Sequence, residues 1–261
     1  MATLETQQKA ERIVDLFRSR QPVEILPAEL YPASLEEAYA IRRIFQEIEV
    51  ASGRGAVAGY KIGLTTPVMQ QLCGVNEPCY GAIFAAEVHH HRAELAAGDY
   101  RRLGVETEIA LRLGEDLPQA DRRERAAAAV EGCMAAIELI EDLGHDYKQL
   151  DAAALVAGNV WNAGVVLGMP VREWTALDLA RAAARLSING RTIGYGTGGD
   201  VMGHPLNALV WLANKLAEAG TPLRRGMIVM TGSMVPIKYP VAGDRVRVEI
   251  DGFGAAELAV T

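Results

Sequence analysis

Two glutamates, Glu106 and Glu108, lie one residue apart in the run GVETEIAL at positions 104–111, which has the composition of a strand. Side chains alternate across a strand, so these two like-charged carboxylates share one face. Such a pair is unfavourable unless a proton or a cation intervenes, and a divalent metal is the simplest answer. The alternative is an ordinary amphipathic strand whose polar face lies in water. The opposite face is suited to core packing and carries Val105, Thr107, Ile109, Leu111 and Leu113.

Two further residues could complete such a site. Lys61 lies on the same expected strand face as Gly59 and Gly63, whose missing side chains leave room for a ligand or for another backbone. Glu138 stands in the apolar run AAIELI at 135–140, where an ionised carboxylate needs a partner, so it is a candidate third metal ligand. Each also has a simpler interpretation, Lys61 as an exposed lysine on an edge strand and Glu138 as the exposed face of a helix end.

Hydrophobic periodicity and capping signals predict the elements that position these residues. A helical section comes first, and its second helix begins with a capping box made by Ser34 and Glu37. The later half is mostly strand. The helical section and the strands together predict a single α+β domain. The predicted helices cover 5–20, 34–52, 67–72, 122–134 (leading into 135–140) and 205–219, and the predicted strands cover 57–64, 104–111, 164–167, 185–188, 227–231 and 245–250.

The composition is typical of a small-molecule enzyme. Half of the 261 residues are hydrophobic, enough for one large core, and the net charge of −7 argues against a nucleic-acid or anionic-membrane surface. Cys73, Cys79 and Cys133 form no C-x-x-C pair and are odd in number, which favours neither a zinc site nor a disulfide framework. The N-terminal residues do not resemble a signal peptide, and no apolar run approaches the ~20 residues of a membrane span. We therefore expect a cytoplasmic protein that is neither secreted nor membrane-embedded.

Other suggestive stretches do not predict a site. The consecutive residues His89, His90 and His91 would point to alternate faces of a strand, so they are expected at the surface. The glycine-rich segment 196–200 lacks the spacing of a phosphate-binding loop and is expected to be a flexible loop. No serine has a G-x-S-x-G setting, and His204-Pro205 predicts the start of a helix.

Five motifs, taken together and in order, resemble the 2-keto-4-pentenoate hydratase and 4-oxalocrotonate decarboxylase family of the fumarylacetoacetate hydrolase superfamily. They are GYKIGLT at 59–65, GVNEP at 74–78, ETEIA at 106–110, GHPLN at 203–207 and MTG at 230–232. The resemblance implies an α+β fold, with a mixed β-roll like the C-terminal domain of fumarylacetoacetate hydrolase at 56–261 and a helical section at 1–55.

The resemblance also implies a site. In this family three glutamates bind Mg²⁺ or Mn²⁺, and they correspond to Glu106, Glu108 and Glu138, while Lys61 corresponds to an active-site lysine. We expect burial beside a cation to lower the pKa of Lys61 into a range useful for proton transfer. The expected substrate-binding residues come from three of the conserved segments: Cys79, Trp161, Thr231 and Gly232.

The implied reaction is the hydration of a 2-hydroxydienoic acid to a 4-hydroxy-2-oxo acid, as in the breakdown of aromatic compounds. A 4-oxalocrotonate decarboxylase-like activity is the alternative, because both reactions need the same electron sink at the 2-oxygen. A non-catalytic member that only binds a 2-oxo acid is a third possibility. We expect a homo-oligomer with a small-molecule substrate and with no nucleic-acid or membrane partner.

The chain departs from the family pattern at three places. Cys79 replaces a usual aspartate, the segment GNVW at 158–161 replaces D-N-[AS]-S, and Gly104 stands where a basic residue is usual. If Cys79 and Trp161 line the outer end of the pocket, they make it more apolar. This predicts a substrate with an apolar or aromatic tail and no second carboxylate.

Overall fold

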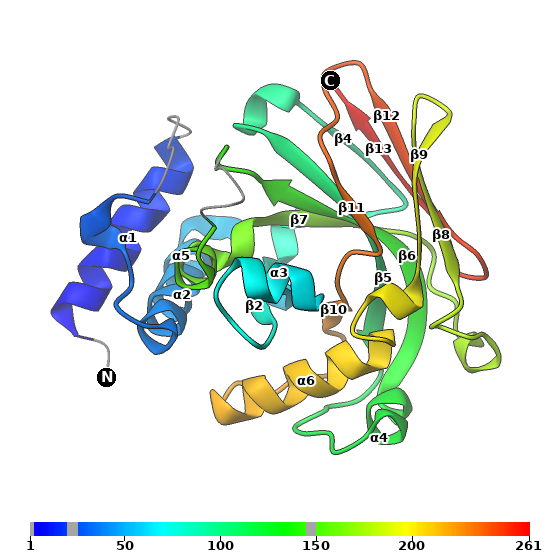
Figure 1. The fold of residues 1–261 in the computed structure, drawn as a ribbon, viewed down its shortest axis with the longest axis horizontal. Coiled ribbons are helices and arrows are strands. Elements are labelled where there is room, and N and C mark those ends of the chain that lie inside the picture. Colours follow the sequence, from blue (N-terminus) through cyan, green and yellow to red (C-terminus); the bar gives the residue numbers. More distant parts are fainter. Residues whose placement is uncertain (1–2, 20–25, 145–149) are drawn as a thin grey trace.

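The computed structural model describes residues 3–19, 26–144 and 150–261. They form two β-sheets, with a group of helices at one side and one long helix below the strands (Figure 1). The helices are α1 (Leu4–Ser19), α2 (Leu35–Glu49), α3 (Pro67–Leu72), α4 (Arg123–Ala128), α5 (Ala152–Ala157) and α6 (Pro205–Glu218).

The larger sheet has eight strands in the order β2-β1-β10-β5-β6-β7-β3, and β11 also pairs with β5. Its pairs are antiparallel except β1 with β10 and β3 with β7. Its strands are β1 (Val57–Gly63), β2 (Cys79–Phe84), β3 (Val88–His90), β5 (Leu103–Leu113), β6 (Val130–Glu141), β7 (Asn162–Leu167), β10 (Ile228–Met230) and β11 (Val235–Lys238).

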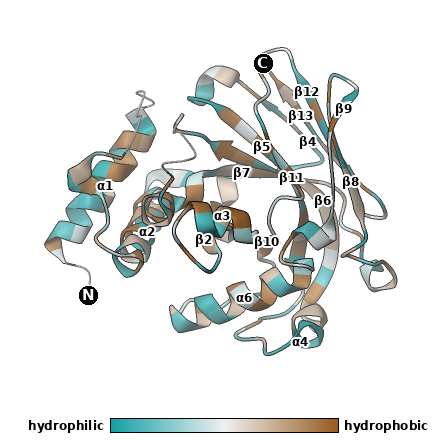
Figure 2. Cartoon of the chain, viewed as in Figure 1, coloured by the Kyte–Doolittle hydropathy of each residue, from teal (hydrophilic) through white to brown (hydrophobic). Residues whose placement is uncertain are grey.

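The smaller sheet has five strands in the order β4-β13-β12-β8-β9 and contacts the larger one mainly through β6. Residues Val105, Ile109 and Leu111 of β5 lie in the core, which confirms the predicted apolar face. Hydrophobic residues gather along the strands of both sheets (Figure 2). The strands of this sheet are β4 (Arg92–Leu95), β8 (Ala183–Ile188), β9 (Arg191–Thr197), β12 (Arg245–Ile250) and β13 (Gly254–Val260).

Strand β6 corrects the prediction of a long alanine-rich helix at 122–134. Helix α4 ends at Ala128, and β6 then runs antiparallel to β5 from Val130 to Glu141. Alanine favours a helix locally, but residues 130–134 pair with β5, and β7 pairs with β6 further along, from Ala136 to Ile140. Glu138 is therefore in mid-strand and fully buried, not at an exposed helix end.

The N-terminal helices were predicted closely. Helix α2 begins after Ser34, whose hydroxyl accepts a hydrogen bond from the Glu37 N–H at 3.2 Å, whereas the Glu37 carboxylate reaches the N–H of Ala33. Helices α1 and α2 pack together around Ile13, Ile41 and further apolar residues. The predicted helix at 5–20 is α1 over its described part, since residue 20 lies outside the described residues.

Several strands were not predicted. Strand β2 is buried at every position, so it shows no alternation to mark it as a strand.

Segment 196–200 is ordered structure: β9 runs to Thr197 and a 3-10 turn follows it. His204 caps α6 by accepting from the Leu206 N–H, which confirms the helix entry. Within the described residues, no helix has the length and apolar character to cross a membrane.

Candidate metal centre

Three glutamates converge on one face of the larger sheet. Glu106 lies directly opposite Glu138 in the β5–β6 pairing, and Glu108 is two residues along β5 on the same face. One carboxylate oxygen from each residue lies within 4.8 Å of those of the other two. The alternation of the strand thus brings the residues together as predicted, and β6 supplies the third.

The carboxylates have the character of metal ligands. Glu108 and Glu138 are fully buried, and Oε1 of Glu108 and Oε2 of Glu138 have no hydrogen-bond partner among the described residues. Burial and the neighbouring charge of Glu138 raise the pKa of Glu106 to about 7 and hold that of Glu108 well above its usual value. Buried carboxylate oxygens without partners are costly, and a hard divalent cation prefers oxygen ligands of this kind. The triad therefore fits a divalent metal.

Lys61 is the cation that this structure places against the triad. Its Nζ lies 2.9 Å from Oε1 of Glu138, and its side chain is 4% exposed. Strand β1 lies between β2 and β10, so the interpretation of Lys61 as an exposed lysine on an edge strand is wrong. Burial by itself lowers the pKa of Lys61, but the charges of Glu138 and Glu106 outweigh burial and raise it. The carboxylates alone raise this pKa, and the lowering expected beside a bound cation stays a prediction.

Other parts of the protein, and not an open space, lie against the glycines on either side of Lys61. A side chain at Gly59 would lie 1.9 Å from the carbonyl oxygen of Ile228 in the neighbouring strand β10. One at Gly63 would lie 2.9 Å from Cγ1 of Val160. The close backbone approach that was one of the two predicted uses of these glycines is confirmed at Gly59.

Two neighbours fix the carboxylates in place. The N–H of Gly232 donates to Oε2 of Glu108 at 2.7 Å, and Nδ2 of Asn162 donates to Oε1 of Glu138 at 2.9 Å. Thr231 is buried, and its hydroxyl donates to the carbonyl of Ile109. Asn162 was missed, because a lone asparagine at the start of a strand has no sequence signal that connects it to Glu138.

A cavity of about 830 Å³ leads from the surface to this centre. Lys61 and Glu106 line it at the inner end, while the strongly exposed residues Val68 and Tyr195 mark its mouth. Trp161 also lines the cavity. It follows Asn159 and Val160 in a run of three residues with positive φ, an unusual conformation for a β-branched residue such as Val160.

Cys79 lies beside Lys61 and is not among the residues that line the cavity. It pairs with Gly63 across the β1–β2 ladder, and a side chain at Gly63 would be 3.4 Å from its Sγ and 3.9 Å from Nζ of Lys61. Burial raises the pKa of the Cys79 thiol to about 12. The expectation that Cys79 forms the outer end of the pocket is therefore not met, and its contact with substrate stays a prediction.

Comparisons with known proteins identify the family of this chain. The family model of the fumarylacetoacetate hydrolase C-terminal domain matches residues 77–261. A 2-hydroxyhexa-2,4-dienoate hydratase of Comamonas testosteroni is 32% identical over 99% of this chain and 97% of its own length. A 2-keto-4-pentenoate hydratase of Dechloromonas aromatica is 36% identical over 85% of this chain and 84% of its own length.

A solved structure has a similar fold over the whole chain. The 4-oxalocrotonate decarboxylase of Pseudomonas putida G7, complexed with magnesium and adipate, aligns with a TM-score of 0.91 and 22% identity, covering 100% of this chain and 99% of that one. A fumarylpyruvate hydrolase of Pseudomonas aeruginosa, complexed with Mn²⁺ and pyruvate, aligns with a TM-score of 0.61 and 18% identity over 77% of this chain and 88% of that one. By its sequence relatives and family match, this chain belongs to the 2-keto-4-pentenoate hydratase and 4-oxalocrotonate decarboxylase family of the fumarylacetoacetate hydrolase superfamily.

Proposed function

We propose that the protein is a divalent-metal-dependent hydratase that adds water to a 2-hydroxydienoic acid and releases a 4-hydroxy-2-oxo acid. The observation that carries the proposal is the buried triad of Glu106, Glu108 and Glu138 at the inner end of a cavity, with Lys61 beside it. Relatives of 30–36% identity that are named as hydratases of such acids support it.

The three glutamates would hold Mg²⁺ or Mn²⁺, since hard cations prefer carboxylate oxygens. When bound there, the metal supplies a Lewis acid for the carboxylate and 2-oxygen of a 2-oxo acid. Gly232 and Asn162 keep the ligand oxygens oriented through their hydrogen bonds to Glu108 and Glu138. Magnesium, manganese and calcium in the similar solved structures support a divalent ion of this kind.

Lys61 is the proposed proton donor. Its Nζ lies 2.9 Å from Oε1 of Glu138 at the inner end of the cavity, where it can donate a hydrogen bond or a proton to the substrate. Leu64, Val160 and Trp161 line the cavity beyond it and exclude bulk water from part of the bound acid. Thr231 and Gly232 would act indirectly, because their hydrogen bonds position Glu108 and the adjoining backbone.

The test is metal-dependent turnover of 2-hydroxypenta-2,4-dienoate, followed by the loss of its ultraviolet absorbance and by identification of the product. We expect 4-hydroxy-2-oxopentanoate to form with Mg²⁺ or Mn²⁺ and not after chelation. A parallel assay with 2-oxohex-3-enedioate measures CO₂ release, which would indicate the decarboxylase reaction instead. Binding of 2-oxo acids without turnover of either substrate would contradict an enzymatic role.

We also propose that the protein is a cytoplasmic homo-oligomer. The free, buried cysteines are typical of a protein in a reducing compartment. Light scattering coupled to size-exclusion chromatography would measure the mass, and a mass equal to the 28.1 kDa of one chain would contradict the oligomer.

A further inference from the structure

An arginine lies at the outer part of the cavity, just ahead of the strand that carries two metal ligands. Arg102 stands in a bend immediately before β5, where its carbonyl accepts from the Asp142 N–H at 3.1 Å. Its Cα atom is four residues from that of Glu106, a separation of up to about 13 Å. Arg102 lines the cavity and is exposed, so it stands toward the mouth while Glu106 stands at the inner end.

The guanidinium of Arg102 is held flat against an aromatic ring. Its central carbon lies 3.4 Å from the centre of the Tyr239 ring, and Tyr239 also lines the cavity. The Tyr239 hydroxyl in turn donates to Oδ2 of Asp142 at 2.5 Å, and Asp142 is fully buried. Stacking occupies the face of the guanidinium and leaves the N–H groups along its edge able to bind a planar anion.

Arg102 has no acidic partner of its own in the part of the chain that the structure describes. Its neighbour Arg101, by contrast, pairs with Glu141. Arg102 lines the cavity, lies against the Tyr239 ring and lacks a carboxylate partner. Such an arginine is well suited to bind the carboxylate of a ligand, often with two parallel hydrogen bonds.

The wall between the two ends of the cavity is apolar. Gly104 stands between Arg102 and Glu106, and a side chain there would lie 2.6 Å from Cδ1 of Ile237 and 3.1 Å from Cβ of Ile140. Ile140 and Ile237 both line the cavity and cover this glycine. A ligand that spans the cavity therefore meets acidic residues and a lysine at one end, a hydrocarbon surface in the middle and a cation at the other end.

We infer that Arg102 binds a second, terminal carboxylate, so that the preferred substrate is a 2-oxo dioic acid with a short hydrocarbon chain between its two charged ends. This rests on the proposed function, because it assumes that the metal centre holds the 2-oxo acid end. It replaces the expectation of an apolar tail, which required Cys79 at the outer end of the pocket. The structure places Cys79 beside Lys61 and places a cation near the mouth.

The same contact favours hydration over decarboxylation of such a substrate. A carboxylate that leaves as CO₂ loses its negative charge, so an ion pair with Arg102 stabilises the reactant more than the transition state. In hydration the terminal carboxylate keeps its charge throughout, and the ion pair serves as an anchor that orients the chain.

The test compares two unreactive acids that differ only in the terminal carboxylate, 2-oxohexanedioate and 2-oxohexanoate. Calorimetry on the Mg²⁺-loaded protein should give an affinity about tenfold higher for the dioic acid, as one charge-assisted pair in a partly exposed site provides. In Arg102→Gln this ratio should fall to about one, and Arg102→Lys should lie between because lysine keeps the charge but lacks the planar fork. Arg43→Gln removes an exposed arginine of α2 and should keep the ratio of the unsubstituted protein.

Two results would overturn this inference alone: equal affinities for the two acids in the unsubstituted protein, or an unchanged ratio in Arg102→Gln, while 2-hydroxypenta-2,4-dienoate is still hydrated. If neither acid binds and no dienoate is turned over, the proposed function fails and the inference fails with it.

Discussion

At the scale of single residues, the buried ion pair of Lys61 and Glu138 gives the clearest prediction. Lys61→Met keeps most of the side-chain volume and removes the ammonium group, so we expect turnover to fall by ~10² or more. The metal ligands remain, so calorimetry should still detect Mg²⁺ binding. Steady-state activity within about threefold of the unsubstituted enzyme would show that Lys61 has no part in proton transfer or substrate binding.

The raised pKa of Glu106 predicts how the metal-depleted protein responds to pH. An acid whose pKa is raised by folding, here to about 7, stabilises the fold below its unfolded value of 4.5 and loses that contribution as the pH rises through 7. The melting temperature in chelator should therefore fall between pH 5 and pH 8. Glu106→Gln should lessen this decline, and excess Mg²⁺ should remove it. A melting temperature in chelator that rises over this range would contradict the shift.

The residues of the site differ in how well the sequence predicts them. Glu106 and Glu108 could be placed together because strand alternation is a local rule. Arg102 lies in a bend just ahead of β5, and its role depends on Tyr239, which is distant in sequence. Asn162 depends equally on a contact that only the folded chain creates.

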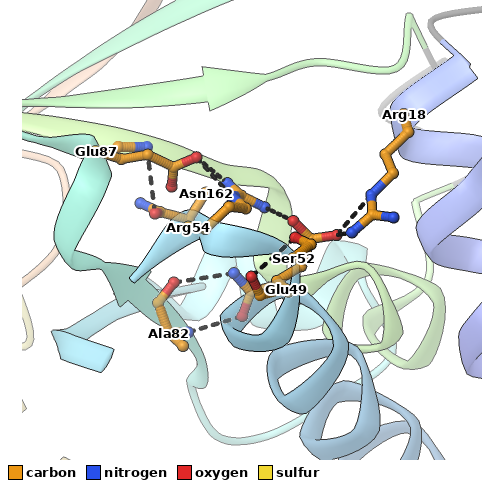
Figure 3. A network of polar contacts seen from close by, with 9 residues as sticks. Arg18, Glu49, Ser52, Arg54, Ala82, Glu87 and Asn162 are labelled. Atoms are coloured by element: carbon orange, nitrogen blue, oxygen red, sulfur yellow. Dashed lines mark hydrogen bonds and ion pairs between the residues drawn. The ribbon is translucent and has the colours of Figure 1, made fainter. Parts of the chain in front are cut away.

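At the scale of elements, a network of ion pairs joins the N-terminal helices to the sheet (Figure 3). Glu49 at the end of α2 accepts from Arg18 of α1 and from Arg54, at 2.9 Å in both pairs, and Arg54 also pairs with Glu87 beside β3. The Glu49 side chain is only 5% exposed, and the Arg54 guanidinium lies over the Phe84 ring. The network thus fixes the N-terminal helices against the edge of the larger sheet near β3.

Arg54→Met should lower the free energy of unfolding by about 2 kcal/mol, because it leaves the buried Glu49 and half-buried Glu87 with less compensation. Arg12→Met is a matched control that breaks an exposed pair with Glu29 and should cost under about 0.5 kcal/mol. Urea denaturation of both variants measures the difference. Equal midpoints for the two would show that the network adds no stability.

Elements were predictable where their own residues determine them. Helices α3 and α6 have a proline at the first turn and a side-chain cap before it, and both begin at the predicted residue. The segment 130–134 could not be assigned in this way, because its alanines favour a helix while its pairing with β5 favours a strand. Pairing between distant segments decided the outcome there, and it also produced the unpredicted strands β2 and β13.

At the scale of the whole molecule, the closed core predicts unreactive thiols. All three cysteines are buried, and burial raises the pKa of Cys73 to about 11, that of Cys79 to about 12 and that of Cys133 further. A thiol reagent at pH 8 should modify none of them in the folded protein and all three in denaturant. Rapid modification of one thiol before unfolding would mean that this part of the core opens readily.

The central claim concerns the whole arrangement, because strands β5 and β6 must pair in the observed register for the three glutamates to share one ion. Titration calorimetry of Mg²⁺ and Mn²⁺ into the unsubstituted protein, Glu108→Gln and Glu131→Gln tests it most directly. Glu131 lies on β6 outside the triad, so its variant controls for the loss of one carboxylate from the same pair of strands. We expect Glu108→Gln to weaken binding by about a hundredfold or more and Glu131→Gln to leave it unchanged. Equal affinities in all three proteins would contradict the metal centre.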